Sequence, residues 1–152
     1  MKWSDEMKGI KKVVPWLLVA LWMMVIFYFS HQPATQSSHL SSGITQMLMD
    51  ILKKVMPNVA FDVEGFHYLV RKNAHFFVYL VLGLLVVNGL RSSGIKGYKK
   101  IGISIAICVL YAISDEVHQL FVPGRAGQIK DVLIDSSGAI VGILIGGLTS
   151  LR

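Results

Sequence analysis

Charged residues are scarce in this sequence, and their scarcity excludes most water-soluble folds. Asp, Glu, Lys and Arg make up 16% of the 152 residues, whereas an ordinary soluble domain carries about 25%. The mean hydropathy is +0.57, and the charges that are present lie between long apolar stretches. Such a chain lacks the charge for a soluble outer shell, and its length suits one domain. We therefore expect a single integral membrane domain over residues 1–152.

Cysteine is nearly absent, which excludes further kinds of protein. Cys108 is the only cysteine and lies inside an apolar run, so neither a disulfide within the chain nor a metal site built from several thiolates can form. We expect a buried, apolar thiol. A basic patch interleaved with aromatic residues is also missing. The net charge of +6 therefore predicts contact with lipid headgroups and no nucleic-acid partner.

Four apolar segments are long enough, or nearly long enough, to cross a bilayer. About 20 helical residues, at a rise of 1.5 Å each, cross roughly 30 Å of hydrocarbon. The third segment is apolar for only 14 residues before Asp115 and Glu116, and reaches adequate length only by continuing to Phe121. The first segment is not followed by a small-x-small cleavage site, which predicts an uncleaved span. The predicted spans are about residues 13–30, 73–90, 101–121 and 132–151.

The connection between the first two spans is long and holds a fifth helical pattern. Apolar residues recur at helical spacing over residues 45–55, with Lys53 and Lys54 beside them. This pattern predicts a short helix that lies at the membrane interface. The fold class expected is therefore all-α: a polytopic membrane helical bundle with about four transmembrane helices and a short interfacial helix in the first outer loop.

The basic residues predict the orientation of the chain. Nine of the fifteen Lys and Arg residues fall in residues 1–12, in residues 91–100 and at Arg152. Because Lys and Arg concentrate in cytoplasmic loops, both termini are expected inside the cell. All five histidines and most carboxylates then lie at the outer side, so any polar site is predicted to be extracytoplasmic.

The second and third spans each carry a polar stripe near this outer side. Arg71, His75 and Tyr79 follow one another at four-residue spacing, which places them on one helix face. The third span ends with its own set on a shared face: Tyr111, Asp115, His118 and Gln119.

The fourth span adds carboxylates and glycines. Asp131 and Asp135 lie one turn apart near its start. Gly138, Gly142 and Gly146 follow at four-residue spacing, a ridge that lets another helix approach closely. We expect this ridge to hold the two carboxylates against the other polar stripes.

Ionisable groups at this depth cost a few kcal/mol each when they face lipid, so they usually face a bundle interior or an aqueous cavity. They either form mutual salt bridges that hold the bundle together or line a site. The candidate catalytic residues are His75, Asp115, Glu116, His118 and Asp131. The candidate phosphate- or substrate-binding residues are Gln32, Arg71, Lys72, Tyr79, Gln119 and Arg125.

Four strings of residues resemble the VanZ-like membrane proteins, a family named for a teicoplanin-resistance accessory protein. The resemblance implies a helical integral membrane domain and, for the namesake at least, a link to glycopeptide resistance. It implies no settled reaction. The strings are Phe29-Ser30-x-Gln32-Pro33, Arg71-Lys72-x-x-His75-x-x-x-Tyr79, Asp115-Glu116-x-His118-Gln119-x-Phe121-x-Pro123-Gly124-Arg125 and Asp131-x-x-x-Asp135-x-x-Gly138.

Three functional hypotheses remain open from the residues. The first is a site for a lipid phosphate or cell-envelope precursor, with polyprenyl-phosphate or phospholipid headgroups among the membrane lipids as candidate partners. Arg engages two phosphate oxygens at once, and His75 or His118 could act as acid, base or nucleophile. Whether the protein is an enzyme is left open, as is its oligomeric state.

The second hypothesis is a metal site formed by Asp115, Glu116 and His118 with His75 from a facing helix. Helical geometry places Asp115 and His118 on one side and predicts that Glu116 turns away. We therefore assign no metal and no cofactor. The third hypothesis is a non-enzymatic accessory or scaffold protein, or a small transporter, whose polar cluster is structural or forms a solute path.

Overall fold

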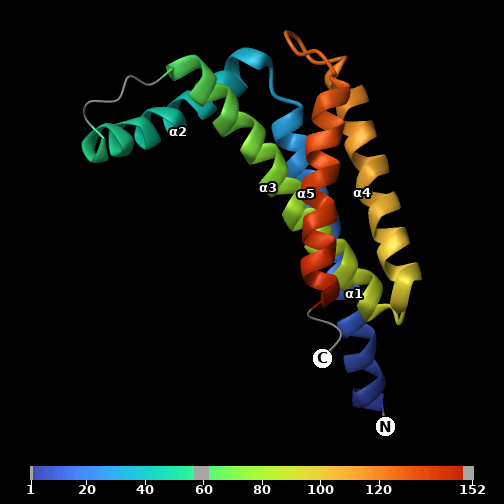
Figure 1. Ribbon diagram of the computed structural model, residues 1–152. Coiled ribbons are helices and arrows are strands. Elements are labelled where there is room, and N and C mark those ends of the chain that lie inside the picture. The colour runs from blue at the N-terminus through green and yellow to red at the C-terminus, as the bar shows by residue number, and fades with distance from the viewer. Residues whose placement is uncertain (1, 57–61, 149–152) are drawn as a thin grey trace.

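The described residues of the chain form five α-helices (Figure 1). The computed structural model describes residues 2–56 and 62–148, with side chains from residue 9 onward apart from residues 40 and 148, and within these residues it contains no strand. The helices are α1 (Lys2–Ser30), α2 (Ala34–Val55), α3 (Val63–Ser92), α4 (Gly97–Gln119) and α5 (Ile129–Leu148).

The predicted all-α membrane fold is confirmed. Among the described residues, three segments are long and apolar enough to cross a bilayer: Gly9–Ser30, Val63–Ser92 and Gly97–Gln119. The fourth predicted span begins within α5, and its last residues, 149–151, lie outside the described residues, as does Arg152. In Figure 1, α1 and α4 rise while α3 and α5 descend, so the start of α1, the α3–α4 connection and the end of α5 share one end of the bundle.

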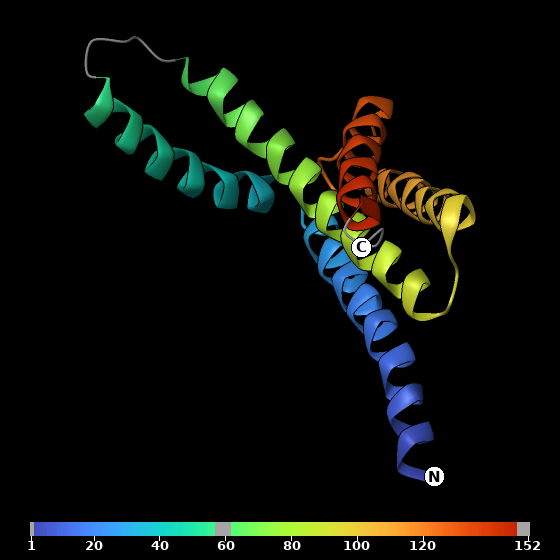
Figure 2. The same cartoon turned by 60° about the horizontal axis from the view of Figure 1, so that its bottom comes forward.

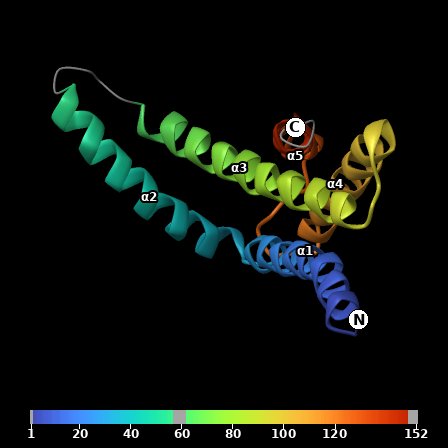
Figure 3. The ribbon, with the colours of Figure 1, turned by 90° about the horizontal axis from the view of Figure 1, so that it is seen from below.

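Helix α3 is the centre of the bundle. It contacts each of the other four helices and lies between α1 and α5 in the view from below (Figure 3). Its buried residues include Leu82 and Val86, which pack with Cys108 of α4 and Ile143 of α5. The thiol of Cys108 is free and fully buried, as expected.

The α3–α5 contact is close because glycines of α5 meet the backbone of α3. A Cβ added at Gly138 would overlap the carbonyl oxygen of Phe76, and one added at Gly142 would overlap that of Leu80. Gly146, one turn further, faces side chains of α3. The predicted glycine ridge is therefore a real contact surface, and it sets how deeply α5 sits against α3.

Helix α3 begins ten residues earlier than the predicted span. Asp62 is its N-cap, and the Asp62 side chain accepts a hydrogen bond from Gly65 N at 3.1 Å. The cap satisfies a backbone donor at the first turn, so the helix starts before the apolar run does. As a result Arg71 and Lys72 lie within α3 rather than at its start.

Helix α2 is also longer than predicted and extends away from the bundle (Figure 2). Its second half covers the expected amphipathic segment, but the Ser-rich stretch before it is helical too. Ser41 Oγ donates to Ser37 O at 2.7 Å and Thr45 Oγ1 donates to Ser41 O at 2.8 Å. These bonds satisfy the hydroxyls inside the helix. Met47 and Val55, with 67% and 72% of their surface exposed, give α2 an apolar face suited to a membrane interface.

Candidate functional site

A cavity of about 530 Å³ lies between α1, α2 and α3, at the end of the bundle away from the N-terminus. Its wall is apolar along α1, where Trp22, Ile26 and Phe29 line it. Trp22 is held in place because its Nε1 donates to Val78 O of α3 at 2.9 Å. Six of the predicted site residues line this one cavity: Gln32, Arg71, His75, Tyr79, Asp115 and Arg125.

Arg125 joins three parts of the chain at the rim of the cavity. Its Nε donates to Gln32 O at 2.9 Å, Nη2 to Phe29 O at 3.2 Å, and Nη1 to Gln119 Oε1 at 3.2 Å. The α4–α5 connection is thereby tied to the end of α1. Burial lowers the pKa of the Arg125 guanidinium, and the positive charge of Arg71 lowers it further. The two arginines are thus close enough to repel each other.

Arg71 and Lys72 are neighbours in the sequence but differ in their partners. Lys72 Nζ forms an ion pair with Asp131 Oδ1 of α5, with both side chains largely buried. Arg71 lines the cavity and forms no hydrogen bond or ion pair with the described part of the chain. Arg71 is therefore the cation available to a ligand, whereas Lys72 is engaged in holding α3 to α5.

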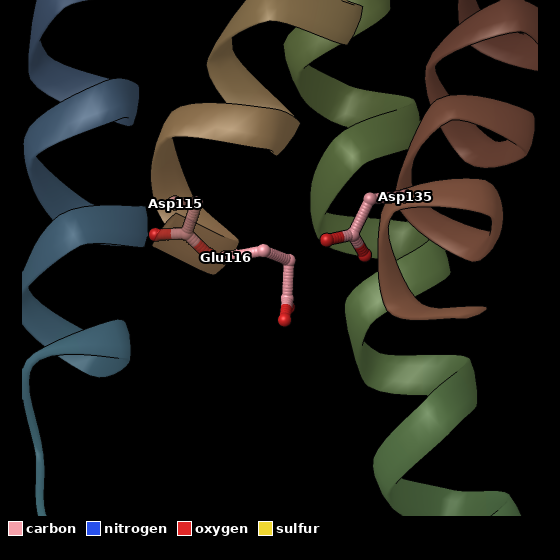
Figure 4. Close-up of side chains that lie close together, drawn as sticks. All are labelled: Asp115, Glu116 and Asp135. Atoms are coloured by element: carbon pink, nitrogen blue, oxygen red, sulfur yellow. The ribbon is translucent and has the colours of Figure 1, made fainter. Parts of the chain in front are cut away.

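Three carboxylates lie close together next to this cavity, Asp115 and Glu116 from α4 and Asp135 from α5 (Figure 4). Asp115, Glu116 and Asp135 each offer an oxygen, and these oxygens all lie within 4.8 Å of one another. The residues are 4%, 5% and 0% exposed. Gln119 Nε2 donates to Asp115 Oδ2 and to Glu116 Oε1, each at 3.3 Å, and Gln128 N donates to Glu116 Oε2 at 2.8 Å.

Several of the buried polar atoms here have no hydrogen-bond partner within the described residues. They are Asp115 Oδ1, both carboxylate oxygens of Asp135 and the hydroxyl of Tyr79. His75 Nδ1 lies 3.5 Å from Asp135 Oδ1, near enough for an ion pair when the imidazole is protonated. Buried polar atoms are normally paired, so this group of atoms has capacity for a ligand.

His118 lies apart from the carboxylates, although the sequence predicted it beside Asp115. Its Nε2 is 3.1 Å from His31 Nδ1, and its ring lies 4.6 Å from that of Phe27, so it faces the end of α1. Glu116 was expected to turn away from Asp115, and this expectation is wrong. The long Glu116 side chain reaches Gln128 N at the start of α5, which brings its carboxylate toward that of Asp115.

Asp135 is the residue of this region that the sequence analysis did not choose as a candidate site residue. The signal was present, because Asp135 lies one helical turn after Asp131 and within the last of the four family-like strings. The contribution of the Gln128 backbone N–H left no trace in the side-chain pattern, since any residue supplies such a group. The roles proposed for all of these residues remain predictions.

Comparison with known proteins gives one match. Residues 15–149 match a family model described as VanZ/LLP1. The matched range includes all four of the strings that resemble the VanZ-like proteins and every residue of the cavity and carboxylate cluster. Neither the curated proteins nor the solved structures include a match to this chain.

Proposed function

We propose that this chain, a multi-pass membrane protein that belongs to the VanZ/LLP1 family, binds the phosphate-bearing headgroup of a membrane lipid in the cavity between α1, α2 and α3. The observation that carries the proposal is the composition of that single cavity. Arg71 and Arg125 lie in it together with His75, and apolar side chains of α1 and α3 form the rest of its wall. A lipid phosphate has the same two parts, a charged headgroup and an apolar chain.

The two arginines supply the recognition of phosphate. A guanidinium offers several N–H donors in one plane and engages two phosphate oxygens at once. Arg71 has no other partner within the described residues, and Arg125 lies near enough to feel its charge. A phosphate placed between the two guanidinium groups would be attracted to both and would offset their mutual repulsion. Phosphate binding is therefore most favourable at that position.

The apolar wall supplies a place for the start of the lipid chain. Trp22, Ile26 and Phe29 of α1 line the cavity together with Val78 of α3. Ligand cavities commonly measure about 300–1,000 Å³, and the present volume of about 530 Å³ holds a headgroup with the first part of its chain. The remainder of a polyprenyl or acyl chain would extend along the helices into the bilayer.

His75 is the residue best placed for proton transfer in this cavity. Its Nδ1 lies 3.5 Å from Asp135 Oδ1, and a carboxylate beside an imidazole orients the ring for proton transfer. Turnover of the bound lipid, if it occurs, would depend on His75.

Polyprenyl phosphates carry cell-envelope precursors, so the same proposal accounts for a link to teicoplanin resistance through the envelope.

The proposed topology places both termini in the cytoplasm and the cavity at the outer leaflet. Residues 91–100 and the start of α1, at the end of the bundle opposite the cavity (Figure 1), hold most of the Lys and Arg residues. In a Cys108→Ala background, Ser38→Cys should react with an impermeant thiol reagent in intact cells and Ser93→Cys should not. The reverse pattern would overturn this orientation.

The proposal is tested with the purified full chain and radiolabelled lipids. A polyprenyl phosphate and phosphatidic acid are the two headgroup sources, and the uncharged polyprenol is the control ligand. We expect binding of at least one phosphate and none of the polyprenol. Arg71→Ala should weaken binding at least tenfold, whereas the control Arg91→Ala, which removes an exposed arginine bonded to Asn88 at the other end of α3, should leave it unchanged.

Phosphate release is measured in the same samples. Release that disappears in His75→Ala would make the protein an enzyme, and binding without release would make it a carrier or accessory protein. If neither phosphate binds, or if Arg71→Ala and Arg91→Ala weaken binding equally, the proposed function is wrong.

A further inference from the structure

The carboxylates of Asp115, Glu116 and Asp135 have the geometry of ligands to a single ion. Their oxygens lie within 4.8 Å of one another. Two oxygens on opposite sides of Mg²⁺ are about 4.2 Å apart, and around Ca²⁺ they are about 5 Å apart. Figure 4 shows that Asp135 extends from α5 toward Glu116 of α4, so the three residues approach one point from two helices.

The charge of this carboxylate cluster is not matched by the protein's permanent cations. Lys72 is paired with Asp131, and Arg125 donates to two backbone carbonyls and to Gln119. Both cations are near enough to act on the charge of the cluster, but they bond to other groups, and the imidazole of His75 lies 3.5 Å from Asp135. Three carboxylates in the interior of a membrane bundle repel one another strongly. A cation would relieve this repulsion.

Tyr79 provides independent support because it is not a member of the cluster. Its side chain is 1% exposed and its hydroxyl has no hydrogen-bond partner within the described residues. The hydroxyl lies close enough to all three carboxylates to interact with their charge, and Tyr79 lines the same cavity as Asp115. A buried phenol and buried carboxylate oxygens that lack partners within the described residues have hydrogen-bonding capacity for a ligand, such as an ion with its water.

Neighbouring groups hold the carboxylates in this position. The amide of Gln119 bridges Asp115 and Glu116, and the N–H of Gln128 fixes the second Glu116 oxygen. The imidazole of His75 stands behind Asp135. Metal sites are commonly supported by such outer hydrogen bonds, which orient the ligands.

We propose that Asp115, Glu116 and Asp135 bind one divalent cation of the hard class, Mg²⁺, Mn²⁺ or Ca²⁺, with Tyr79 contacting the ion or its water. The donors are all oxygens, and oxygen donors select these ions over zinc or copper. The ligand set differs from the one that the sequence suggested, because Asp135 and Tyr79 take the places of His118 and His75. The cation site does not depend on lipid binding.

Electron paramagnetic resonance of Mn²⁺ tests the proposal on the full chain in detergent, after treatment with a chelator and without added lipid. We expect one bound Mn²⁺ per chain, displaced by excess Mg²⁺ or Ca²⁺. Asp135→Asn and Glu116→Gln should each weaken binding at least tenfold. Asp50→Asn, which removes an exposed carboxylate of α2, should leave it unchanged, and Arg71→Ala should leave it unchanged even though it loses lipid binding.

The thermal stability of the wild-type chain gives a second measurement that does not require the variants to fold. Mn²⁺ should raise the unfolding temperature of the wild-type protein, and a chelator should lower it again. The absence of bound Mn²⁺ at millimolar concentration with no change in unfolding temperature would show that the carboxylates share protons instead, and would overturn the proposal. So would equal Mn²⁺ binding by the wild type and Asp135→Asn.

Discussion

The two faces of α3 are constructed in opposite ways. The face toward α5 is closed, because Gly138 and Gly142 rest directly on the backbone of Phe76 and Leu80. The face toward α1 and α2 is open and lines a cavity into which polar residues such as Arg71 project. The same helix therefore carries a tightly packed surface on one side and a cavity-lining surface on another.

The difference shows how a small membrane protein can hold unpaired polar groups. Where the glycines of α5 meet α3, the closed face packs through close van der Waals contact of the kind that joins helices in lipid, and the Lys72–Asp131 ion pair joins the same two helices nearby. Gly138 lies less than one turn from Asp135, so the close contact fixes the depth at which this carboxylate meets those of α4. Stability from the closed face offsets the cost of burying Asp115 Oδ1, the Asp135 carboxylate and the Tyr79 hydroxyl without hydrogen-bond partners among the described residues.

Substitution on the closed face is expected to have the largest effect. Gly142→Leu places a side chain where even a Cβ meets the carbonyl oxygen of Leu80, and a backbone atom cannot move aside as a side chain can. The helices must separate, which we expect to cost about 3 kcal/mol or more. Thermal unfolding monitored by size-exclusion chromatography in detergent measures the loss.

The matched control is Gly102→Leu on α4. No atom lies within 4 Å of a Cβ added there, so the unfolding temperature should change little. Equal losses of stability in the two variants would mean that the α3–α5 contact is not closed as described.

An intermediate effect is expected at the ion pair between Lys72, within α3, and Asp131, in the first turn of α5. Lys72→Met leaves the buried carboxylate of Asp131 without its cation, and we expect a loss of about 1–3 kcal/mol. The double variant Lys72→Met/Asp131→Asn removes the uncompensated charge and should recover part of this loss. Chemical or thermal unfolding of the two single variants and the double variant measures the coupling. If the losses simply add, Lys72 and Asp131 act independently.

The fold could be predicted from the sequence further than the site could. Long apolar runs with charged ends indicate spans directly, and the glycine spacing of α5 indicated its packing face. The start of α3 was missed because the Asp62 cap acts over a few residues, whereas the span was located from hydropathy. The length of α2 was missed because Ser41 and its neighbours satisfy their hydroxyls within the helix, although serine is usually taken as a sign of a loop.

The site was harder to predict because it depends on how side chains reach between helices. Helical periodicity alone placed His118 with Asp115 and turned Glu116 away. Glu116 has a long, flexible side chain, and the N–H of Gln128 draws its carboxylate toward α5. His118 instead found a partner in His31 at the end of α1. Neither contact has a signature in the sequence, because each depends on the placement of another helix.

The smallest effect is expected for substitutions at two tryptophans of α1, which differ in how buried their hydrogen bonds are. Trp22 Nε1 donates to Val78 O on the wall of the cavity, in a partly buried position, whereas Trp16 Nε1 donates to Ser93 Oγ at the exposed end of the bundle. Trp22→Phe leaves a carbonyl without that donor away from water, and we expect a loss of about 1 kcal/mol. After Trp16→Phe, the exposed Ser93 Oγ can bond to water instead, so the loss of stability should be smaller. Thermal unfolding of the two variants, each judged against the wild type, measures the difference.

A loss of stability for Trp16→Phe as large as that for Trp22→Phe would mean that the wall of the cavity is as accessible to water as the end of the bundle. The cavity would then be less suited to a lipid chain than its lining indicates.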